Sequence, residues 1–142
     1  MFEFKNENIQ AEWLDFTTKT VKVYEEKVKP VLREPPTSDI PAMLRKLEFY
    51  SGWGPYLAEQ AAKAERFLKI SKAQALADCP FQSPEYKVKV WLEGEIADID
   101  YFYNHLHAVH SASKDSAIQL QTAINIEVEI QGIKTTVQKD RQ

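Results

Sequence analysis

Cysteine is almost absent from this 142-residue sequence, in which Cys79 is the only one. A lone cysteine excludes a disulfide within the chain and a zinc site built from several cysteines. It also favours a reducing compartment, so we expect a cytoplasmic protein. Cys79 lies beside Pro80 with no histidine near it in the sequence, which favours a structural role over a nucleophilic one.

Long apolar runs are absent too. No stretch approaches the roughly 20 residues that a membrane span needs. The first ten residues, MFEFKNENIQ, have neither the basic nor the apolar region of a secretory signal. We therefore expect no signal segment and no membrane partner.

Motifs for catalysis and for cofactors are missing. The glycines form no phosphate loop, because SGWGP has neither Walker nor Rossmann spacing. The histidines His105, His107 and His110 are close in sequence, but His105 points roughly 200° away from His107 on a helix, so they do not converge on a metal. The carboxylates between residues 93 and 100 fit a solvated helix flank better than an acid–base pair. We expect no enzyme, no metal and no cofactor.

The net charge is −3, but the charges are unevenly distributed. Residues 41–77 carry six basic and three acidic side chains, whereas residues 84–112 carry two basic and five acidic ones. One interpretation is a pair of helices with complementary faces. The other is a basic binding ridge on the first of these helices.

Apolar residues at helical spacing predict an all-α fold in one domain. The first amphipathic pattern covers residues 9–31, and we expect its helix to stop at Pro30 or at the Pro35–Pro36 pair. A long antiparallel hairpin, similar to a coiled coil, follows. We divide the chain into an N-terminal helix (1–34), a proline-rich linker (35–41), a helical hairpin (42–112) and a C-terminal segment (113–142).

The first helix of the hairpin has a clear predicted start, with Ser38 or Asp39 as its cap and Pro41 in the first turn. Its apolar stripe keeps the same phase across the segment GWGP. This predicts one continuous helix, kinked near Pro55, in preference to two separate helices. Gly54 falls on the stripe, where we expect another helix to approach closely.

The second helix of the hairpin is predicted to begin with Ser83 as its cap and Pro84 in its first position. Its apolar stripe continues to Ile124, with a break expected in the polar residues 110–116. The tail INIEVEIQGIKTTVQ alternates between apolar and polar residues. It fits a small β-hairpin or a helix that runs to about Gln131.

Basic and aromatic residues mark a candidate binding surface on the first hairpin helix. On a helical wheel Lys63, Arg66 and Lys69 point away from the apolar stripe, and Tyr56 lies between the stripe and these cations. Trp53 at the kink extends the aromatic set. Rings that stack on bases beside cations that hold phosphates are typical of single-stranded nucleic-acid binding. The alternative is that the aromatics widen the core and the lysines keep the helix soluble.

Three segments follow one another in an order that resembles a known family: LRKLEFYSGWG on a basic helix, SPEYKVKVWLEGE at the start of the next, and SAIQLQTAIN after a polar break. Together with the element YSGxG at residues 50–54, they make residues 40–125 similar to the UvsY-like recombination mediators of tailed phages. The chain departs from the family at Trp53-Gly54-Pro55, where the family tends to have a basic stretch. The resemblance implies a helical oligomer that binds single-stranded DNA through Arg45, Lys46 and Tyr50 and helps to load a recombinase.

We therefore predict a phage-type accessory protein that self-associates and binds single-stranded DNA, with a recombinase or another protein as a further partner. Self-association is expected because the apolar stripes are longer than a thin hairpin can bury. Two alternatives stay open. One is a helical interaction module, such as an adaptor or an inhibitor of a host defence factor. The other is a binder of a small nucleotide.

Overall fold

The fold is all-α, as the sequence predicts. The computed structural model describes residues 2–140, with side chains for residues 2–138, and contains no strand in that range. The tail that alternates in sequence is therefore helical, and its helix continues past Gln131. The elements in chain order are α1 (Glu7–Val23), the π-helical turn η1 (Tyr24–Val28), α2 (Lys29–Leu32), α3 (Ile40–Ala77), α4 (Glu85–Glu95) and α5 (Ala97–Asp140).

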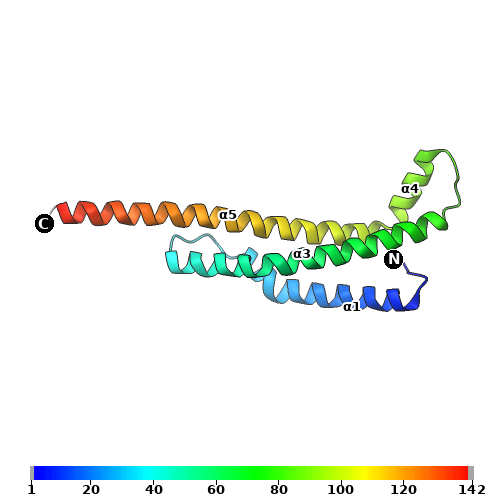
Figure 1. Ribbon diagram of the computed structural model, residues 1–142, viewed down its shortest axis with the longest axis horizontal. Coiled ribbons are helices and arrows are strands. Elements are labelled where there is room, and N and C mark those ends of the chain that lie inside the picture. Colours follow the sequence, from blue (N-terminus) through cyan, green and yellow to red (C-terminus); the bar gives the residue numbers. More distant parts are fainter. Residues whose placement is uncertain (1, 141–142) are drawn as a thin grey trace.

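The two longest helices, α3 and α5, pack side by side and run in opposite directions, which confirms the predicted hairpin (Figure 1). Helix α1 lies along the hairpin and contributes Trp13 to its core, where Phe67 of α3 also lies. The molecule is elongated, and the C-terminal part of α5 projects well past the start of α3 (Figure 1). Between residues 2 and 140 no helix combines the length and the apolarity that a membrane span requires.

The expected stop at Pro30 is wrong, because the chain stays helical to Leu32. A π-turn comes just before the proline: the N–H of Lys29 bonds the carbonyl of Tyr24, five residues back. Such a turn widens the backbone and accommodates a proline, which lacks an N–H and whose ring would clash in an ordinary α-helix. The helix then ends at Leu32, and the Pro35–Pro36 pair lies in the extended linker that follows.

Helix α3 is continuous through Pro55, as the unbroken phase of its apolar stripe predicts. It begins as expected, because the side chain of Asp39 accepts a hydrogen bond from the N–H of Ala42. The expectation for Gly54 is wrong. A Cβ atom at Gly54 would meet nothing within 4 Å, so no neighbouring helix requires a glycine there.

The second half of the hairpin breaks at a different place from the one predicted. Pro84 precedes α4 without a side-chain cap, so the expected Ser83 cap is not formed. Helix α4 ends at Glu95, next to Gly94, and Ile96 separates it from α5. Glycine weakens a helix locally. The polar residues 110–116, by contrast, stay helical, and Ser113 among them is buried in the bundle.

An extended strap at the N-terminus closes one end of the bundle. Phe2 and Phe4 alternate with Glu3 and Lys5, so both rings enter the core while the charged side chains face outward. The rings contact each other edge to face, with centroids 5.1 Å apart. This packing holds α1 against the end of the α3–α5 hairpin.

Candidate interaction surfaces

The predicted basic ridge exists as a row of exposed side chains on α3. Lys63, Arg66 and Lys69 keep 53%, 63% and 75% of their side-chain area exposed. Each has an acidic neighbour. Lys63 and Lys69 pair with glutamates one turn back on α3 at 3.4 Å, and Arg66 faces a glutamate of α1 at 3.8 Å. The ridge is therefore accessible but charge-balanced.

The groove beside this ridge lies between α1 and α3 and has a volume of about 370 Å³. Three cations line the groove: Lys19 of α1, and Lys63 and Arg66 of α3. Lys19 pairs with Asp15 on α1 at 2.9 Å, and the other two are paired as described above. Because every cation here lies beside a carboxylate, the groove offers little net attraction for an anion.

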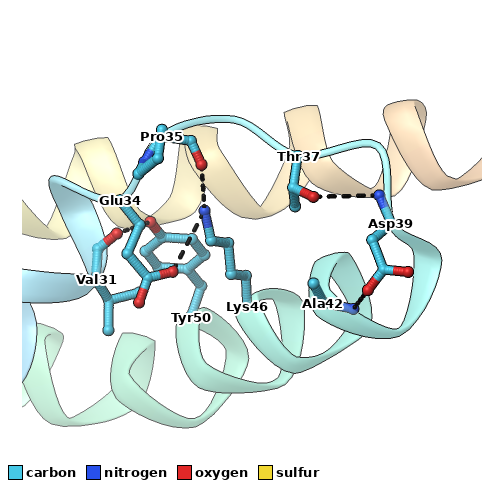
Figure 2. Close-up of polar contacts among 8 residues, drawn as sticks. All are labelled: Val31, Glu34, Pro35, Thr37, Asp39, Ala42, Lys46 and Tyr50. Atoms are coloured by element: carbon cyan, nitrogen blue, oxygen red, sulfur yellow. Dashed lines mark hydrogen bonds and ion pairs between the residues drawn. The ribbon is translucent and has the colours of Figure 1, made fainter.

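Lys46 and Tyr50 contact the segment that runs from α2 into the linker (Figure 2). Lys46 donates a hydrogen bond to the carbonyl of Pro35 at 3.0 Å, and its Nζ lies 3.4 Å from a carboxylate oxygen of Glu34. Only 15% of the Lys46 side chain is exposed. Tyr50 is buried, and its hydroxyl lies 3.5 Å from the carbonyl of Val31. Neither side chain faces outward, so a base or a phosphate has little access to them.

The same linker is held at its far end by short local contacts (Figure 2). The hydroxyl of Thr37 accepts a hydrogen bond from the N–H of Asp39 at 3.2 Å, and Asp39 caps α3. Arg45, the remaining cation that the resemblance implies, is exposed and has no ion pair among the described residues.

Trp53 lies half-buried in a row of aromatic side chains. Its ring is 5.7 Å from that of Phe49 and 5.1 Å from that of Tyr56, measured between centroids. Trp53 and Tyr56 both pack against an apolar cluster centred on Val28 and Leu57. They therefore join α3 to the π-turn and leave only part of each ring exposed.

Burial raises the pKa of two tyrosines in this region. For Tyr50, burial acts most strongly, a hydrogen bond from Ser116 opposes it, and the negative charge of Glu34 adds to the increase in pKa. For Tyr56, burial and then the charge of Glu59 raise the pKa. Both side chains are therefore neutral at physiological pH and stabilise the fold as packed rings.

Within the described residues no group of three or more metal-ligating side chains gathers around the histidines. His105 instead lies over Tyr101, with nearly parallel rings 6.3 Å apart, and meets Tyr24 edge to face at 5.4 Å. Cys79 makes a hydrogen bond from its Sγ to the carbonyl of Phe81 at 3.3 Å.

A second surface, which we call the arm, consists of residues 125–138 of α5. The arm projects beyond the rest of the molecule (Figure 1), and all its side chains are exposed except that of Glu127, which is intermediate. It carries five exposed apolar residues: Ile126, Val128, Ile130, Ile133 and Val137. The bundle's own packing ends at Ile124, the last buried residue of α5.

The alternation in the sequence does not single out the arm as a surface. Strict alternation over INIEVEI fits a β-hairpin as well as a helix. A second signal was present. Ile126, Ile130, Ile133 and Val137 are separated by four, three and four residues, which places them on one face of a helix.

Comparison with protein-family models, curated proteins and solved structures found no match. The resemblance to the UvsY-like mediators therefore stays a prediction. Two surfaces of the molecule, the basic ridge and the arm, bear on its function.

Proposed function

We propose that this chain is a helical interaction protein that binds another helix along the arm. The observation that carries the proposal is the row of apolar side chains on a helix that no other segment within residues 2–138 covers. Burial of each such side chain contributes roughly 1.5–3 kcal/mol, so four in one row are a substantial source of binding free energy.

The composition of the arm supports the same conclusion. Five of its residues are β-branched and apolar, two more are threonines, and Gly132 lies among them. Such residues have low helix propensity, and a helical segment of this length is marginal in water without packing. A partner helix along the apolar row supplies the packing that keeps the arm helical.

A photo-crosslinking amino acid at position 133 tests the proposal in cells that make the protein. Ile133 lies in the apolar row, whereas Thr135 lies on the opposite side of the arm and provides a matched control position. We expect covalent adducts from position 133 and few from position 135. An absence of adducts from both positions would contradict the proposal.

Binding of single-stranded DNA along the ridge is the second candidate function, as in an accessory protein that assists recombinase loading. The exposure of Lys63, Arg66 and Lys69 favours it. Their ion-pair distances of 3.4–3.8 Å exceed the roughly 2.7–2.9 Å of a strong charge-assisted hydrogen bond. Exposed pairs of this kind contribute about 0–1 kcal/mol each, so a phosphate can displace the glutamates.

Fluorescence anisotropy with a labelled single-stranded oligonucleotide tests this second function. Three phosphate contacts predict a slope of about −2 in a plot of log affinity against log salt concentration. The triple change Lys63→Glu, Arg66→Glu and Lys69→Glu is expected to abolish binding, whereas Lys87→Glu with Lys89→Glu on α4 preserves it. No binding at low salt would rule the function out.

A further inference from the structure

The apolar row of the arm has the spacing of a coiled-coil seam. In a heptad labelled a to g, Ile126 and Ile133 take d positions, while Ile130 and Val137 take a positions. This seam does not continue the stripe that faces α3. At about 100° per residue, its centre is turned roughly 130° from Leu120 and Ile124. The arm therefore presents its seam away from its own bundle.

We propose that the seam packs against the arms of further copies of this chain, in a parallel bundle of three or more helices. The inference rests on the proposed function and names the partner. Its first support is charge. Glu129 takes a g position and Lys134 the e position five residues later. In a parallel coiled coil, g of one helix faces e of the next heptad on its neighbour, so Glu129 meets Lys134 of another copy.

The number of chains follows from the shape of the core residues. Isoleucine occupies both d positions and one a position, with valine at the other a position. Isoleucine at both kinds of position favours three or four helices over two. Gly132 takes a c position and Thr135 an f position, so neither interrupts the seam.

The remaining e and g residues do not oppose this register. Glu127 takes an e position and faces the g position of Thr122 on the neighbouring copy, which is neutral. Val128 takes an f position on the outer side of the bundle. It is as exposed as Ile126, at 53%, and so provides an internal control for the seam.

Light scattering coupled to size-exclusion chromatography of the purified full chain tests this inference. We expect a mass of three or more chains for the wild type and for Val128→Asp, and a monomer for Ile133→Asp. Both substitutions place a charge on the arm, which carries no aromatic residue, so near-UV circular dichroism, which reports the aromatic side chains of the bundle, should stay unchanged. A monomeric or dimeric wild type would overturn the inference, and so would an oligomeric Ile133→Asp variant.

Charge reversal tests the parallel register. Glu129→Lys alone and Lys134→Glu alone should each weaken the assembly at least several-fold, and the double variant should restore it. No rescue in the double variant would overturn the parallel register. If position 133 crosslinks to a different protein and the purified chain is a monomer, this inference is overturned but the proposed function stands. An absence of any crosslink would remove both.

Discussion

The side chain of Gln74 on α3 holds the backbone of Lys5 in the N-terminal strap. Its Oε1 accepts a hydrogen bond from the N–H of Lys5 at 2.9 Å, and its Nε2 donates to the carbonyl of Glu3 at 2.8 Å. The amide thus satisfies a donor and an acceptor of the strap, as a neighbouring β-strand would. An ion pair between Lys5 and Asp78 lies beside it.

Gln74→Ala is expected to lower the free energy of unfolding by about 1–2 kcal/mol, because two hydrogen bonds to the strap are lost. Gln74→Glu keeps the acceptor and loses the donor, so it should have an intermediate effect. Urea denaturation at neutral pH measures both. Lys72→Ala, an exposed change in the same turn, is the control. An alanine variant as stable as the wild type would show that the strap does not depend on Gln74.

Trp13→Ala is expected to lower the free energy of unfolding more than Gln74→Ala does. Its ring lies 5.2 Å from Phe67 and 5.4 Å from Phe102, so it joins α1 to both helices of the hairpin. Truncation of a buried tryptophan costs about 3–5 kcal/mol through lost burial and a cavity. Thermal and urea denaturation should show the loss, while the neighbouring exposed change Leu14→Ala should cost far less. Similar effects from both changes would contradict the placement of α1.

Gly52→Ala and Gly54→Ala are each expected to stabilise the protein by about 0.5–1 kcal/mol. Both glycines lie inside α3, and a Cβ atom at either position meets nothing within 4 Å. Alanine lowers the entropy of the unfolded chain and raises helix propensity without a clash. Denaturation of each variant, with Ser51→Ala beside them as a control, measures the gain. Destabilisation would mean that the GWGP segment requires a less regular backbone.

Stability at alkaline pH should depend on Tyr50. The hydroxyl ionises near pH 10 in the unfolded chain, whereas burial raises its pKa in the folded protein. The folded state therefore binds the proton more tightly. This contribution is complete below about pH 10 and is lost as the pH rises through the folded pKa. Denaturation midpoints across this range should fall more steeply for the wild type than for Tyr50→Phe.

The exposed Tyr86 provides the comparison for that experiment. Tyr86→Phe should leave the alkaline decrease as steep as in the wild type, because its side chain takes no part in the core. Equal slopes for the wild type and Tyr50→Phe would show that the Tyr50 hydroxyl is not buried against α2.

Local signals in the sequence were sufficient to predict several elements of the fold. The Asp39 cap, the continuity of α3 through Pro55 and the antiparallel hairpin all follow from residue spacing and capping chemistry. Other elements depended on contacts between distant segments. No residue near Pro30 signals the π-turn that accommodates it. The Gly94 signal for the break at Ile96 is local but weak, and Ile96 itself is buried in the core.

The same distinction applies to the candidate sites: some of their features follow from local spacing, and others depend on contacts between distant segments. The sequence shows that Lys63, Arg66 and Lys69 share an outer face, because helical spacing alone determines that. It cannot show that Arg66 lies opposite a glutamate of α1, or that the Tyr50 hydroxyl lies against the carbonyl of Val31 in α2, because both depend on segments that meet only in the folded chain.

By itself, then, the sequence determined an all-α chain, the cap of its central helix and the heptad spacing of the arm, because each depends on the backbone within a few turns. Only the tertiary structure decided which apolar stripe is covered. The stripe of α5 that ends at Ile124 meets α3, and the seam from Ile126 to Val137 stays exposed in the part of the chain that the structure describes. The reason is geometric: α3 begins at Ile40, and α5 extends beyond it (Figure 1).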